Sequence, residues 1–157
     1  VKGITLRGED AVVGMGVVDP EATLLTFCAR GYAKRSTFAD YPVHSRGGLG
    51  VRNLSHSGLE RNGPVVGART VKDGDEIILI TERGQVIRMR VTEEQFRTTG
   101  RDTGGVRAIE VPADDRLVSM AWVRPEEGTE GANGDGPDGG SNGGPDAGAA
   151  GGAADGE

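Results

Sequence analysis

Residues 45–54 read Ser-Arg-Gly-Gly-Leu-Gly-Val-Arg-Asn-Leu, a glycine-rich loop that leads into an apolar run. Glycine adopts positive φ without steric cost, so the three glycines here predict a tight backbone turn. The same order of arginine, paired glycines, Val-Arg and an aliphatic residue recurs in residues 100–109. The chain opens on Val-Lys-Gly-Ile, which matches the end of this motif. Three copies at a spacing of about fifty residues identify a repeat protein.

The segments between the copies repeat as well. Residues 12–18 align with residues 65–71 and again with residues 117–123, and residues 24–31 align with residues 77–84 without a gap. We therefore expect successive repeats to share one local fold.

The local patterns are those of β-strands, because short β-branched runs alternate with Gly, Asp, Asn and Pro. Glycines at Arg30-Gly31 and Arg83-Gly84 lie between paired apolar runs and predict two hairpins. Thr92–Phe96 is the one stretch expected to form a helical turn. The predicted strands are residues 11–18, 24–28, 64–71, 76–81, 86–91, 106–111 and 117–123.

About four strands per repeat cannot bury both faces of their own sheet. Four-stranded sheets repeated around an axis, as in a propeller, solve that problem. The sequence thus predicts an all-β fold.

The composition divides the chain near residue 124. All 18 Lys and Arg residues precede Pro125, whereas 8 of the 24 Asp and Glu residues follow it. The segment from Pro125 onward has no aromatic residue and no aliphatic one larger than Ala, so it cannot offset the entropy of ordering. We expect a mildly basic domain over residues 1–123 and a disordered acidic tail over residues 124–157. The tail is either a solubilising end or a polyanion that competes for the basic surface.

Several side chains that often carry chemistry favour a structural interpretation here. Cys28 lies in an apolar run and is expected in the core, and a single cysteine suits a reducing cytoplasm. Tyr32 and Tyr41 are expected to pack in the hairpins rather than to act as nucleophiles. His44 and His56 lack the cysteine, histidine or carboxylate neighbours of a metal site. No apolar run is long enough to suggest a membrane span.

The fifty-residue all-β repeat, the Gly31–Arg35 turn (Gly-Tyr-Ala-Lys-Arg) and the Arg46–Gly50 loop (Arg-Gly-Gly-Leu-Gly) resemble the C-terminal domain of the A subunit of bacterial DNA gyrase. The resemblance covers Val1 to about Val123. In that family the repeats are blades of a β-pinwheel, a propeller-like disc that wraps DNA around its basic rim. The resemblance implies a partial β-pinwheel over residues 1–123, with two blades and part of a third.

The family's defining loop, the A-box, has a Gln, two basic residues, two Gly, a basic residue and Gly. In this chain His44, Ser45 and Leu49 stand where the Gln and two of the basic residues would be. The resemblance therefore implies a degenerate A-box loop, made of Arg46, Gly47, Gly48 and Gly50.

The resemblance also implies a function. The chain is expected to wrap double-stranded DNA as part of a type IIA topoisomerase, DNA gyrase, which uses ATP to introduce negative supercoils in the bacterial cytoplasm. Expected partners are duplex DNA, a B subunit of gyrase, and a second A subunit in an A2B2 assembly. The catalytic tyrosine and the ATP site of the family lie elsewhere, so no cofactor is expected in this chain, while ATP and Mg²⁺ act in the rest of the holoenzyme.

Two alternatives remain open from the sequence. One is the equivalent domain in the A subunit of topoisomerase IV, a decatenating relative that an intact upstream A-box would distinguish. The other is a propeller for protein–protein contacts without a DNA role, which predicts apolar and aromatic residues along the exposed edge.

Arginines recur at equivalent positions of the repeats, as a surface that follows a phosphate backbone requires. For a single arginine the simpler interpretation is a solvated strand face, as the alternation across residues 86–91 illustrates. For the repeated set, the resemblance favours phosphate contact without readout of base sequence. The predicted phosphate-binding residues are Arg35, Arg46, Arg52, Arg88, Arg90, Arg101 and Arg107.

Overall fold

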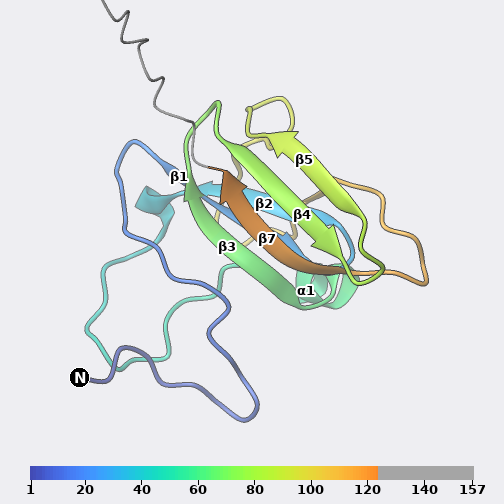
Figure 1. The fold of residues 1–157 in the computed structure, drawn as a ribbon. Coiled ribbons are helices and arrows are strands. Elements are labelled where there is room, and N and C mark those ends of the chain that lie inside the picture. The colour runs from blue at the N-terminus through green and yellow to red at the C-terminus, as the bar shows by residue number, and fades with distance from the viewer. Residues whose placement is uncertain (124–157) are drawn as a thin grey trace, which may run out of the picture. The chain divides into compact units, whose positions relative to one another are not determined.

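The computed structural model describes residues 1–123, and the predicted tail lies outside the described residues. Strands dominate this part of the chain (Figure 1). In chain order the elements are β1 (Thr23–Cys28), β2 (Tyr32–Thr37), the short 3-10 helix η1 (Phe38–Asp40), α1 (His56–Asn62), β3 (Val65–Val71), β4 (Glu76–Thr81), β5 (Val86–Arg90), β6 (Val106–Arg107) and β7 (Leu117–Val123).

Both predicted hairpins are confirmed. β1 pairs antiparallel with β2 across Arg30-Gly31, and β4 pairs with β5 across Arg83-Gly84. Gly31 has φ of 81° and Gly84 has φ of 85°, the left-handed region that side chains disfavour. At Gly31 a Cβ would also collide with the carbonyl oxygen of Ile109. The glycine therefore lets the residues after β6 pass close to the turn.

The hairpins form two sheets that each take an edge strand from the following repeat. The strand order is β3-β1-β2-β6 in the first sheet and β5-β4-β7 in the second. The register repeats too: a bulge falls between Phe27 and Cys28 in the β1–β3 pair, and between Ile80 and Thr81 in the β4–β7 pair. These positions are equivalent in the aligned repeats, so the repeat seen in the sequence is a repeat of strand pairing.

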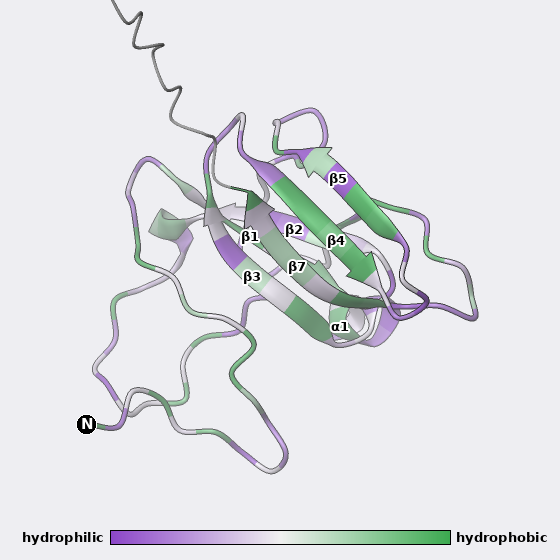
Figure 2. Cartoon of the chain, in the orientation of Figure 1, coloured by the Kyte–Doolittle hydropathy of each residue, from purple (hydrophilic) through white to green (hydrophobic). Residues whose placement is uncertain are grey.

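The core lies between the two sheets, but the sheets do not present equivalent faces to it. Leu25 and Phe27 of β1 are buried there together with Ile77 and Leu79 of β4. Ile78, which aligns with Leu25, alternates with those two β4 residues and lies on the opposite face of the second sheet. Face-to-back stacking of this kind is how blades of a propeller follow one another. Much of β4 is hydrophobic, as Figure 2 shows.

One predicted strand is missing, and another is shorter than expected. Residues 11–18 form no strand, and Val12, Met15 and Val17 are exposed. In the repeat alignment this segment corresponds to β3 and β7, each of which pairs with the first strand of a hairpin. Those first strands, β1 and β4, are already paired with β3 and β7, so neither is available to residues 11–18. The strand predicted over residues 106–111 is limited to Val106–Arg107, which pairs with β2.

One helix was not predicted. Ser55 caps the start of α1, where its Oγ accepts a hydrogen bond from the Gly58 amide at 3.2 Å, and Gly63 follows the helix with φ of 76°. The predicted helical turn over Thr92–Phe96 is confirmed as a single turn, in which the Phe96 amide donates to the Thr92 carbonyl at 2.9 Å. Over the described residues, no helix has the length and apolar character to cross a membrane.

Candidate nucleic-acid interface

The second glycine loop, residues 100–105, is fixed against α1. A Cβ on Gly58 would collide with the Cα of Gly104, so helix and loop touch backbone to backbone. Asn62 Nδ2 donates to the Gly104 carbonyl at 2.6 Å, and Arg61 Nη2 lies 3.2 Å from the carbonyl oxygens of both Gly104 and Gly105. The helix thus holds the loop that leads into β6 and Arg107.

The first glycine loop pairs with the chain's first residues. The Gly47 amide donates to the Gly3 carbonyl at 2.9 Å, and the Thr5 amide donates to the Gly48 carbonyl at 2.8 Å. Arg46 at the start of this loop is exposed.

Lys34 of β2 joins the two glycine motifs. Its side chain is only 2% exposed, and its Nζ donates to the carbonyl oxygens of Asn53 and Arg101. Burial, together with a smaller effect of the nearby Arg101 charge, lowers the pKa of Lys34 to about 8. The buried ammonium therefore fixes the end of one motif beside the start of the next.

Two of the predicted phosphate-binding arginines lie in this region. Arg101 is partly buried, and its guanidinium donates to the carbonyl of Arg52 and, at 3.1 Å, to that of Asp40. Arg52 is itself exposed and keeps its side chain at the surface. Of these two, only Arg52 offers its charge fully to solvent.

The β-strand arginines differ from one another. Arg35 is 5% exposed, with Nε 2.7 Å from Thr23 Oγ1 and Nη1 2.6 Å from Asp73 Oδ1, so its charge is satisfied inside the chain. Arg88 and Arg90 are exposed on β5 and share one carboxylate, that of Glu76. In this structure Arg35 is not accessible to a phosphate, whereas the two β5 arginines are accessible but paired.

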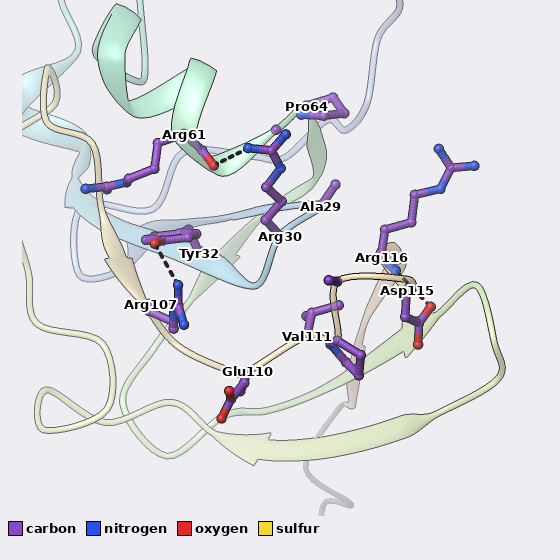
Figure 3. A pocket seen from close by; sticks show the side chains of 13 residues that line it. Ala29, Arg30, Tyr32, Arg61, Pro64, Arg107, Glu110, Val111, Asp115 and Arg116 are labelled. Atoms are coloured by element: carbon purple, nitrogen blue, oxygen red, sulfur yellow. Dashed lines mark hydrogen bonds between the residues drawn. The ribbon is translucent and has the colours of Figure 1, made fainter.

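A hollow of about 650 Å³ lies beside the β1–β2 turn. Four arginines line it against two carboxylates, those of Glu110 and Asp115. We call it the arginine hollow, after Arg30, Arg61, Arg107 and Arg116. The first three lie near Tyr32, and Arg116 lies across the hollow beside Asp115 (Figure 3).

Tyr32 organises two of these arginines. The Arg61 Cζ lies 4.5 Å from the centre of the Tyr32 ring, and the Arg107 Cζ lies 5.4 Å from it. Arg107 Nη2 also donates to the Tyr32 hydroxyl at 3.2 Å, which, with the neighbouring guanidinium charges, lowers the pKa of Tyr32. In Figure 3, Arg61 lies above the ring and Arg107 below it. Arg30 Nη1 donates to the Arg61 carbonyl at 2.9 Å, which orients a third guanidinium at the same place.

Sequence reasoning placed only Arg107 of this hollow among the phosphate-binding residues, and interpreted Tyr32 as a packing residue. Arg61 belongs to the helix that was not predicted, and Arg116 lies in a segment outside the glycine motifs. The Arg-Gly-Tyr sequence at the turn was the available signal, because an aromatic residue between arginines provides a surface for guanidinium stacking.

Other side chains take structural positions. Cys28 is buried as predicted, and burial raises the pKa of its thiol to about 11. The Tyr41 hydroxyl donates to Asn53 Oδ1, consistent with a packing role. Among residues 1–123, no group of three His, Cys, Asp or Glu side chains is placed to hold a metal ion.

The repeats, their sheets and their loops match a known family. Residues 1–19, 22–72 and 75–121 match the model of the DNA gyrase C-terminal domain, a beta-propeller. The chain belongs to this family.

Curated relatives agree with this assignment. The DNA gyrase A subunit from Kosmotoga olearia is 43% identical over 125 residues, which make up 78% of this chain and 15% of that protein. The one from Streptomyces coelicolor is 40% identical over 136 residues, 87% of this chain and 15% of that protein. The Escherichia coli protein is 41% identical over 120 residues, 76% of this chain and 13% of that protein. The chain therefore spans 13–15% of the length of these relatives.

Two solved structures resemble the fold. A DNA gyrase A C-terminal domain aligns with a TM-score of 0.59 at 28% identity, over 67% of this chain and 34% of that one. The C-terminal domain of a DNA topoisomerase IV aligns with a TM-score of 0.69 at 23% identity, over 78% of this chain and 38% of that one. The second likeness concerns the fold alone. The all-β, partial β-pinwheel expected from the sequence is confirmed.

Proposed function

We propose that this chain binds and bends duplex DNA without sequence specificity, as the DNA-wrapping region of a DNA gyrase A subunit. The observation that carries the proposal is the number of exposed arginines, on the glycine loops, on β5 and in the arginine hollow, in a chain that belongs to the gyrase C-terminal family. A guanidinium donates two parallel hydrogen bonds to a phosphate, and several of them along one surface track a DNA backbone.

Within the holoenzyme, the proposed role is to wrap DNA so that ATP-driven strand passage introduces negative supercoils. The proposed assembly is a type IIA topoisomerase with two A and two B subunits, in the bacterial cytoplasm. ATP and Mg²⁺ act in other parts of that assembly, and we propose no cofactor for this chain. We also propose that residues 1–123 make two blades and part of a third.

Phosphate contacts in the proposed interface come from exposed members of the predicted set: Arg46, Arg52, Arg88, Arg90 and Arg107. Arg101 contributes mainly by holding the carbonyl of Arg52. Arg35 is assigned a structural role, because Asp73 and Thr23 already satisfy its guanidinium.

Topoisomerase IV is the second candidate. Its C-terminal domain shares the fold, but the curated relatives named above, at 40–43% identity, are gyrase A subunits. A pure protein-interaction module is less well supported, since the hollow beside the β1–β2 turn is lined by arginines rather than by apolar side chains alone.

A bending measurement tests the proposal. A duplex of about 40 base pairs carries a donor and an acceptor dye at its two ends, and energy transfer is followed as the chain is added at low salt. Bending brings the ends together, so transfer rises with protein concentration, and the rise is reversed when salt is added. Binding without any change in transfer would contradict a wrapping role.

A further inference from the structure

The two hairpin turns have equivalent sequences but different charge environments. At the β4–β5 turn, Arg83 Nη1 lies 2.6 Å from the Asp114 carboxylate. At the β1–β2 turn the equivalent residue, Arg30, donates to backbone carbonyls of α1 rather than to a carboxylate. Tyr32 has Gln85 as its counterpart, so the second turn lacks the aromatic ring.

Three separate elements converge on the first turn. Tyr32 begins β2, Arg61 comes from the last turn of α1, and Arg107 ends β6. Arg61 and Arg107 lie on opposite sides of the Tyr32 ring, so two guanidinium groups of like charge flank one aromatic side chain. Such an arrangement suits a site that receives an anion, since like charges placed together cost free energy unless a counter-charge enters.

We propose that the arginine hollow is the principal phosphate-binding site of this chain, taking a phosphodiester of duplex DNA beside the Tyr32 ring, which Arg61 and Arg107 flank. This inference rests on the proposed function. It adds a phosphate site at the β1–β2 turn that the equivalent β4–β5 turn lacks.

The geometry supplies what a phosphate needs. Each guanidinium is already positioned by the ring, so binding a phosphate orders less side-chain freedom than it would with a free arginine. The Tyr32 hydroxyl accepts from Arg107, which leaves its own hydrogen available to a phosphate oxygen. Arg116 extends from the far side of the hollow, with its guanidinium 2.8 Å from Glu82 Oε1.

The test compares two double variants that remove the same charge. Arg61→Gln with Arg107→Gln removes two of the four arginines of the hollow. Lys72→Gln with Arg83→Gln removes two cationic side chains outside the hollow that already have carboxylate partners. Affinity for a duplex of about 30 base pairs is measured by fluorescence anisotropy over a salt series. Loss of two phosphate contacts makes the slope of log K against log salt less steep by about 1.8 and weakens binding at least tenfold at low salt. The control pair is expected to change affinity less than threefold.

Because Arg61 also holds the second glycine loop, its loss could weaken DNA binding by disturbing the fold. A second pair of substitutions separates an effect on binding from an effect on folding. Arg107→Gln with Arg116→Gln leaves the hydrogen bonds from Arg61 to Gly104 and Gly105 in place. It is expected to weaken binding severalfold with an unchanged far-ultraviolet circular dichroism spectrum. Glu110→Gln removes a carboxylate from the hollow and is expected to tighten binding, whereas Glu94→Gln, at an exposed position outside the hollow, is not.

The outcomes separate the two claims. Failure of the unaltered chain to bind DNA contradicts the proposed function itself. DNA binding that weakens equally in the hollow pair and in the control pair overturns only the hollow. If the hollow pair loses affinity for polyglutamate but keeps its affinity for DNA, the hollow binds an acidic polypeptide, and the inference is overturned. Displacement of DNA by millimolar inorganic phosphate, at an ionic strength held constant with chloride, would identify a site for free phosphate instead.

Discussion

Arg35 and Arg88 occupy equivalent positions of the repeat, and each donates a hydrogen bond to the residue at one further equivalent position. Arg35 is nevertheless buried, whereas Arg88 is exposed. Arg35 Nε donates to Thr23 Oγ1 at 2.7 Å, and Arg88 Nε donates to Glu76 Oε2, the equivalent residue, at 2.8 Å. The face that carries Arg35 packs against the second sheet, whereas the face that carries Arg88 is open to solvent in this structure.

This difference predicts different costs for the two arginines. Arg35→Ala removes charged hydrogen bonds and packing from the core edge and is expected to lower the free energy of unfolding by about 2 kcal/mol. Arg88→Ala removes an exposed ion pair and is expected to change it by less than about 1 kcal/mol. Urea unfolding of both variants measures the difference. Equal costs would show that Arg35 is not the structural residue its contacts indicate.

Much of the fold follows from the sequence because the repeat shows which strands are equivalent. β4 has the predicted bounds, and β1, β3, β5 and β7 differ from the prediction by one residue at an end or not at all. The segment 11–18 has the same strand-like pattern but no strand, since a strand requires a partner and the pattern does not reveal whether one is present. α1 escaped prediction because it is short and contains Gly58, a residue that disfavours helix.

The site is less predictable than the fold. The glycine loops and their arginines were visible, but the burial of Arg35 depends on how the sheets stack. The hollow joins Tyr32, Arg61 and Arg107, which are far apart in sequence and meet only when α1 packs on the second glycine loop. A local sequence pattern does not indicate that three elements distant in sequence come into contact.

Gly58 tests the contact between helix and loop. Alanine at this position improves helix propensity by about 1 kcal/mol but places a methyl group against the Gly104 backbone. The clash is with backbone and cannot relax by a rotamer change, so we expect Gly58→Ala to destabilise the chain by about 1–2 kcal/mol net. Gly100→Ala has open space around its Cβ and serves as the control. Thermal denaturation compares the two variants, and a stabilised Gly58→Ala chain would contradict the close approach.

Stability should depend on pH through Lys34. Because burial lowers the pKa of Lys34 to about 8 from the ordinary 10.5, the folded state loses this proton before the unfolded state does. The free energy of unfolding therefore rises as pH increases above 8. Cys28 acts in the opposite direction above pH 9, since burial raises its pKa from 9.0 to about 11.

The Cys28→Ala variant separates these two effects. Its free energy of unfolding is expected to keep rising between about pH 8 and 10, while the rise in the unaltered chain weakens above about pH 9. Lys34→Met in the same background should remove the rise. A variant with Lys34 intact and a flat profile over this range would refute the buried ammonium as the cause.

The acidic tail gives a prediction that depends on charge alone. Residues 125–157 carry 8 Asp and Glu side chains and no basic side chain. If the tail competes with DNA, ending the chain at Arg124 should tighten DNA binding at low salt and change little at high salt, where screening is strong. Equal affinities at low salt would leave the tail as a solubilising end.

The most direct test of the account is the salt dependence of binding to two duplexes of equal length and unrelated sequence. If about four phosphates are neutralised, log K should fall against log salt with a slope of roughly −3.6 for both duplexes. Binding through backbone phosphates also predicts affinities for the two sequences that agree within about threefold. A slope near zero, or a strong preference for one sequence, would contradict a DNA-wrapping surface built from arginines.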